Sequence, residues 1–151
     1  MERAQLAALA ADIRSGRVAL FHGGRPALRV GGEILPPSVT GVPSSRLTQQ
    51  SAGVGPVRTR EDLVYVTTEK NLALASAASW MSRARGNGRG WLYRVELDDG
   101  VELELDDDLP RGPFVSFQLR RARVAEVLDR GVDPNDSRHR IWLERFVRSL
   151  G

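Results

Sequence analysis

His22 is the first residue whose type and place in the chain could serve chemistry. It ends a short apolar run that begins at Val18, and two glycines, Gly23 and Gly24, follow it. Because glycine has no side chain, a ligand can approach the backbone closely beside the imidazole. The pattern indicates a ligand-binding strand end, although a capped structural histidine would have the same sequence.

Tyr65 is the second such residue, since it lies within the β-type run 63–67 and leads directly into a helix of small residues. Thr68 can cap this helix, which we expect to start at Glu69. Small residues let the backbone of a helix pack close to a sheet or a ligand. The stretch therefore indicates the wall of a small-molecule cleft or, more simply, a strand–helix unit with a half-buried tyrosine.

A run of three carboxylates, Asp106, Asp107 and Asp108, is the third feature. Adjacent negative charges repel one another and favour water, a metal ion or a cationic ligand. No companion histidine or carboxylate cluster accompanies them, so we predict no dedicated metal site. A solvated turn is the simpler interpretation of the run.

Strands and helices must position these residues. We expect helices over 2–14, 69–81 and 138–150, and strands over 18–24, 27–35, 63–67, 91–97, 101–105, 113–119 and 121–128. The turn Asp98-Asp99-Gly100 predicts a hairpin between the strands on either side of it. This order of elements predicts an α+β fold with a mainly antiparallel sheet and short helices.

The whole chain, 1–151, is predicted to form one domain, because its length allows a proper hydrophobic core. An N-terminal helix falls within 1–16 and a C-terminal helix within 137–150. The stretch 36–60 contains four prolines and many serines and threonines. We expect it to form a mobile loop beside the site.

Composition narrows the function classes. The chain has no cysteine, which excludes disulfides, thiolate catalysis and cysteine-based zinc sites. It has no apolar run of about 18 residues and no signal-peptide pattern, so we predict a cytoplasmic protein without a membrane partner. The net charge is +3, and every base except Lys70 is an arginine. No interleaving of aromatic and basic residues favours nucleic acid as a partner.

Taken in order, His22-Gly23, Tyr65 and an aspartate in 106–108 resemble the His-Tyr-acid triad of the ADP-ribosyltransferase superfold. More specifically, the chain resembles the rifamycin ADP-ribosyltransferase family over about residues 18 to 130. The segments that carry the resemblance are 20–23, 28–36, 64–73, 92–96, 104–108 and 121–127. The resemblance implies a split, mainly antiparallel sheet and NAD as the co-substrate.

The resemblance also implies how the chain would bind NAD. Tyr65 would stack on nicotinamide, His22 would hydrogen-bond a ribose hydroxyl, and the Gly23 backbone would bond the carboxamide. Gly24 and Thr67 complete the implied NAD-binding set. The family has threonine or serine at the position of Gly24, so a hydroxyl group that contacts nicotinamide there is missing from this chain.

Transfer of ADP-ribose passes through an oxocarbenium-like transition state, which a carboxylate near the anomeric carbon stabilises. Asp108 is the expected acid, and Asp107 is the next choice. The implied enzyme is a mono-ADP-ribosyltransferase that acts on a small hydroxylated molecule, such as a rifamycin-like antibiotic, or on a macromolecule. The sequence does not name the acceptor or the oligomeric state.

Two alternatives share the superfold. An RNA 2′-phosphotransferase would use clusters of arginine and histidine on an RNA phosphate, but the chain lacks the motif of that class. A catalytically degenerate member would bind a nucleotide or a protein, and Gly24 together with the unusual loop 36–60 motivates this alternative.

Overall fold

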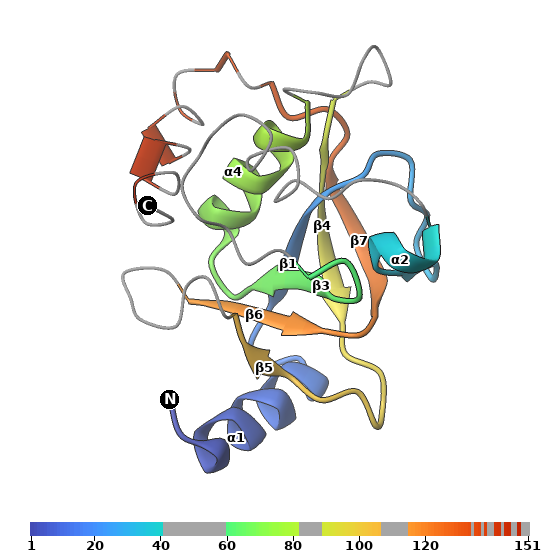
Figure 1. Cartoon of the computed structure of the whole chain (residues 1–151), viewed down its shortest axis with the longest axis vertical. Coiled ribbons are helices and arrows are strands. Elements are labelled where there is room, and N and C mark those ends of the chain that lie inside the picture. The colour runs from blue at the N-terminus through green and yellow to red at the C-terminus, as the bar shows by residue number, and fades with distance from the viewer. Residues whose placement is uncertain are drawn as a thin grey trace.

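The computed structural model describes residues 1–40, 60–81, 89–106 and 115–133, and 135, 136, 138, 141, 142, 144, 145 and 148 in the C-terminal segment. Most of the predicted loop 36–60 therefore lies outside the described residues. Within the described ranges, the chain is a mixed α/β structure with one sheet and few helices (Figure 1).

Seven strands form the sheet in the order β2-β7-β4-β1-β3-β6-β5. Their bounds are β1 Leu20–Gly24, β2 Glu33–Ile34, β3 Val64–Thr67, β4 Trp91–Glu96, β5 Glu104–Leu105, β6 Ser116–Leu119 and β7 Ala122–Asp129. Each pair of neighbouring strands is antiparallel. The prediction of an α+β fold with a mainly antiparallel sheet is confirmed at this level.

The sheet has two parts that join at β1 and β3. Phe21 of β1 pairs with Thr67 of β3, and this is the one registered pair that joins these two strands. By contrast, β1 pairs with β4 along its full length. In Figure 1, β4 and β7 run close to vertical, whereas β3 and β6 cross the view more horizontally. The two parts therefore diverge on either side of the Phe21–Thr67 pair.

The predicted hairpin at 98–100 is wrong. The strands on either side of this turn, β4 and β5, do not pair with each other. β4 lies between β1 and β7, and β5 pairs with β6 at one end of the sheet. The turn residue Asp98 accepts hydrogen bonds from Arg123 of β7, at 3.1 Å from Nε and 3.3 Å from Nη2. Arg14 donates to the carbonyl of Val101 at 2.9 Å, which ties the segment after the turn to the N-terminal helix. These long-range contacts override the local turn preference.

Three helices have defined bounds: α1 Arg3–Arg14, α2 Pro37–Thr40 and α4 Lys70–Met81. The prediction for α1 is confirmed, and Glu2 and Gln5 form a capping box at its start. α2 lies where the sequence predicted the beginning of a loop. In the predicted C-terminal helix, the described residues from 138 to 148 are helical. Ile141 is 55% exposed there.

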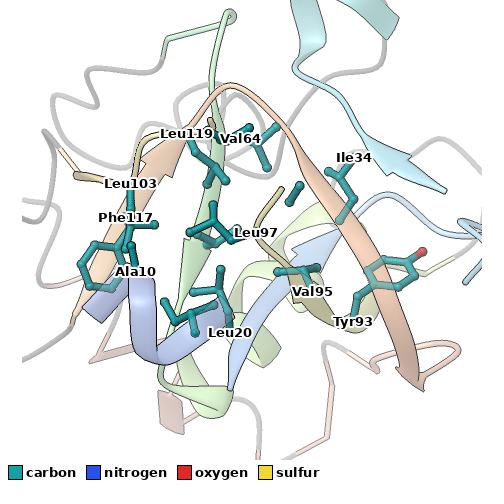
Figure 2. Packing of buried hydrophobic residues seen from close by; sticks show 14 of the residues in the cluster. Ala10, Leu20, Ile34, Val64, Tyr93, Val95, Leu97, Leu103, Phe117 and Leu119 are labelled. Atoms are coloured by element: carbon teal, nitrogen blue, oxygen red, sulfur yellow. The ribbon is translucent and has the colours of Figure 1, made fainter. Parts of the chain in front are cut away.

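The main core lies on the face of the sheet away from α4 (Figure 2). β1 and β4 contribute Leu20, Tyr93 and Val95, and α1 covers them with Ala10 and Ile13. A smaller cluster forms under α4 on the other face, from Ala73, Ala77, Ala78, Leu92 and Val132. Alternate residues along each strand therefore face two different environments.

None of the helices in the described ranges is long and apolar enough to span a membrane.

Candidate active site

A small pocket lies where the two parts of the sheet meet beneath α4. Its walls come from Gly23 of β1, Tyr65 and Thr67 of β3, Ser116 of β6, and Leu72, Ala73 and Ser76 of α4, with Phe21 and Val66 beside them. We call it the junction pocket. It brings together Gly23, Tyr65 and Thr67, three residues that the sequence assigned to one site. Its free volume is about 10 Å³, which holds about one water molecule.

Gly23 allows α4 to lie directly on β1. A Cβ atom at this position would stand 1.8 Å from the carbonyl oxygen of Ala73 and 2.8 Å from the backbone nitrogen of Ala77. Gly90, just before β4, meets α4 in the same way, since its Cβ would stand 2.1 Å from the Ala77 oxygen. The prediction that small residues let this helix pack close to the sheet is confirmed. Gly23 and Gly90 make the same close approach possible from the side of the sheet, because they have no side chain.

The side chain of His22 contacts the backbone of β3. Its Nδ1–H donates to the carbonyl oxygen of Tyr65 at 2.8 Å. The ring stacks on Tyr93, its partner in β4, with centroids 6.3 Å apart. Because Phe21 and Gly23 face α4, alternation places His22 on the opposite face of the sheet. The structure thus brings His22 to the Tyr65 backbone, while the Tyr65 ring lies on the α4 face.

The environment of His22 fixes its protonation and its tautomer. Burial lowers the pKa of the imidazole, and this outweighs the opposite effect of the hydrogen bond to the Tyr65 carbonyl. The ring is therefore neutral near pH 7. Because Nδ1 carries the proton that is donated to the carbonyl, Nε2 holds a lone pair and can accept a hydrogen bond from a hydroxyl group.

Gly24 lies against this same nitrogen. A Cβ atom at Gly24 would stand 3.0 Å from Nε2 of His22. The threonine or serine of the resembled family would therefore crowd the imidazole in its present place. In this chain the imidazole of His22 occupies the space into which a side chain at position 24 would extend.

Tyr65 is half-buried and lines the junction pocket, and half-burial is what the simpler strand–helix interpretation predicted. Its hydroxyl accepts a hydrogen bond from the backbone N–H of Arg60 at 3.0 Å. This bond holds the phenol toward the turn that precedes β3. The ring lines the pocket, while the polar end is fixed by the protein itself.

The hydroxyl of Thr67 has a local structural task. Its Oγ1 donates to the carbonyl of Val115 at 2.5 Å and accepts from the N–H of Glu69 at 2.9 Å. The second bond caps the start of α4, a task that the sequence assigned to Thr68, and the helix begins at Lys70. Thr67 therefore couples β6 to α4 at the edge of the junction pocket.

Of the three predicted acids, Asp106 lies in the described chain, and Asp107 and Asp108 lie outside it. Asp106 is fully buried, and its Oδ2 accepts a hydrogen bond from Ser116 Oγ at 2.7 Å. Its backbone N–H donates to the Ser116 carbonyl at 3.1 Å. Ser116 pairs with Thr67 of β3 and lines the junction pocket. The start of the acidic run is thus anchored one strand away from β3.

Sequence reasoning missed three residues of this region. Ser116 and Ser76 line the pocket, but an isolated serine in a strand or a helix gives no signal of a site. Tyr93 stacks on His22, but the sequence identified it only as part of the strand 91–97. In the described part of the chain, histidine, aspartate and glutamate form no group of three that could hold a metal ion.

No protein-family model matches this chain, and no curated protein matches it.

Proposed function

We propose that the protein is an NAD-dependent mono-ADP-ribosyltransferase whose reaction centre lies at the junction pocket. The observation that supports this most is the convergence of residues far apart in sequence. Gly23 and Tyr65 line one pocket, His22 bonds the Tyr65 carbonyl, and Asp106 bonds Ser116 of the same pocket. A sheet that divides between β1 and β3 agrees with the split sheet that the resemblance implies.

The reaction would break one bond and form one. The bond between the anomeric carbon of NAD and the nicotinamide nitrogen breaks, and its electron pair leaves with nicotinamide. The acceptor hydroxyl then attacks the oxocarbenium-like centre, and its proton passes to a carboxylate or to water. The site must therefore hold nicotinamide, fix the ribose and place a negative charge near the anomeric carbon.

The described residues fit these tasks in part. Neutral His22 has an Nε2 acceptor for a ribose hydroxyl, but its ring lies on the face of the sheet opposite the Tyr65 ring, so this task is not met inside the junction pocket itself. The Tyr65 ring offers a flat surface to nicotinamide. Asp106 anchors the acidic run, from which Asp108, and next Asp107, remain the predicted partners of the cationic transition state. Ser76 lines the junction pocket, and its hydroxyl makes no hydrogen bond within the described chain, so it can bond a ligand in that pocket.

The pocket must widen before nicotinamide can enter, since about 10 Å³ is far below the size of small-molecule sites. The widening cannot come from Gly23, because its backbone is held against α4. The Tyr65 ring is restrained by its bond to the Arg60 N–H.

Nicotinamide release from NAD tests the proposal. The purified protein is incubated with NAD, with and without a panel of hydroxylated acceptors, and nicotinamide is quantified by chromatography. Release by the protein that is lost in both His22→Ala and Tyr65→Ala supports the assignment. Arg17→Ala, which removes an exposed ion pair with Asp12, serves as the control for handling. Retained turnover in both site variants would contradict it.

The second candidate is a member of the same superfold that binds a nucleotide or a protein without catalysis. The small volume of the junction pocket favours it. Absence of both nicotinamide release and NAD binding would move the assignment to this candidate.

A further inference from the structure

A second, larger pocket lies on the face of the sheet away from α4. Its volume is about 420 Å³, within the range of sites for small molecules. The residues that matter for its chemistry are Leu28, Arg29, Val30, Trp91, Val127 and Arg130. They come from the loop after β1, the start of β4 and the end of β7. We call it the Trp91 pocket.

One side of this pocket is a flat apolar wall. Trp91 is half-buried and packs at 6.3 Å from the Tyr93 ring. Val127 stands opposite Tyr93 in β7, and Leu28 closes the wall from the loop. An indole flanked by aliphatic side chains favours a planar ring through apolar and stacking contacts.

The other side is cationic. Arg29 and Arg130 are exposed, and neither is paired with a carboxylate in the described chain. The guanidinium of Arg130 lies 5.8 Å from the centroid of the Trp91 ring. None of the residues that line the pocket carries a negative charge. Two guanidinium groups beside an apolar wall favour an anion with bidentate geometry, such as a phosphate.

The loop that carries Leu28 and Arg29 is held at both ends. The hydroxyl of Tyr93 donates to the carbonyl of Arg25 at 2.6 Å and accepts from the N–H of Leu28 at 3.2 Å. Ala27 between them has a φ of 66°, a conformation that few residues other than glycine adopt. Farther on, the backbone of β7 bonds Gly31 and Gly32. The wall is therefore formed before a ligand arrives, which lowers the entropic cost of binding.

We propose that the Trp91 pocket binds a nucleoside 5′-phosphate, with the base on the apolar wall and the phosphate between Arg29 and Arg130. The same chemistry belongs to a free mononucleotide and to the adenylate half of a dinucleotide such as NAD. This proposal does not rest on the proposed transferase activity, because it concerns binding alone and a separate pocket.

Calorimetric titration with AMP tests it, with adenosine and inorganic phosphate as partial ligands. We expect AMP to bind better than either part, and we expect Arg29→Gln and Arg130→Gln each to weaken AMP at least about tenfold, the loss of one charge-assisted contact. Adenosine binding should be unchanged in both variants. Arg94→Gln, an exposed arginine of β4 outside this pocket, is the matched control for net charge and should bind AMP normally.

A further variant separates geometry from charge. Tyr93→Phe keeps every charge but releases the loop at Arg25 and Leu28, so AMP should bind more weakly. No saturable AMP binding by the folded wild-type protein would overturn the proposal. So would an equal loss in Arg94→Gln, because the attraction would then be non-specific.

NAD identifies the source. If NAD binds more tightly than AMP and the Arg29→Gln loss is the same for both, the pocket holds the adenylate half of the dinucleotide. If AMP binds and NAD does not, the ligand is a free nucleotide. Both results support nucleotide binding at the Trp91 pocket. The second result, together with no nicotinamide release, would contradict the proposed transferase activity and leave the binding proposal standing.

Discussion

Replacing Gly23 by alanine tests the contact on which the junction pocket is built. The added methyl group would stand 1.8 Å from the Ala73 carbonyl oxygen and 2.8 Å from the Ala77 nitrogen. In a helix these two atoms belong to the groups that bond across one turn. The methyl group would therefore enter the hydrogen-bonded backbone of α4, where no flexible side-chain end can yield.

The size of the effect follows from the distance. To reach 3.0 Å, the shortest separation that real Cβ atoms show, the methyl group and the Ala73 oxygen must move apart by a further 1.2 Å. Overpacking of this kind costs about 1–3 kcal/mol, and disturbing one backbone hydrogen bond adds about 1 kcal/mol. We expect a loss of about 3 kcal/mol in the free energy of unfolding. For a domain of this length that lowers Tm by roughly 6–12 °C.

Gly24→Ala is the matched control, because its methyl group would meet only the end of the His22 ring, at 3.0 Å. It should cost less than about 1 kcal/mol. The assay is urea unfolding followed by far-ultraviolet circular dichroism, with the midpoint and the slope fitted for each variant. If Gly23→Ala unfolds at the same midpoint as Gly24→Ala, α4 does not lie on β1 as described, and the reasoning fails.

Two further predictions concern groups at the site. Burial holds the pKa of His22 below its unfolded value of about 6.5, so the folded protein prefers the neutral ring. Its contribution to stability is complete above about pH 6.5 and declines as the pH falls toward the folded pKa, by at most about 1.4 kcal/mol per pH unit. Urea unfolding from pH 7.5 to 5 should therefore show a shallower fall for His22→Asn than for the wild type; parallel curves would contradict the burial. Ser116→Ala leaves the buried Asp106 carboxylate without its hydroxyl donor and should cost about 1–3 kcal/mol. The double variant with Asp106→Asn should cost less than the sum of the two single changes, and simple additivity would show that the two side chains do not interact.

The sequence predicted the helices and strands that have strong local signals. α1, β1, β3, α4 and β4 follow from hydrophobic spacing and from small residues. The hairpin at 98–100 was predicted wrongly, because the pairing of β4 with β7 depends on Arg123 and other contacts far along the chain. A turn motif contains no information about which distant strand will take the neighbouring edge.

The candidate site was predictable in part. Tyr65 and Gly23 could be singled out because strand and glycine signals are local. The structure places both in one pocket. The opposite faces of His22 and Tyr65 follow from strand register, which the sequence left open. The anchoring of Asp106 by Ser116 depends on the pairing of β5 with β6, and a lone serine gives no sign of it.

Nicotinamide release from NAD, measured for the wild-type protein beside the Tyr65→Ala variant, decides whether this chain cleaves NAD at the junction pocket as we propose. We expect release by the wild-type protein and its loss in Tyr65→Ala, whereas Tyr65→Phe should retain activity because it keeps the ring. Release that persists unchanged in Tyr65→Ala would contradict the site, and no release together with no NAD binding would contradict the function.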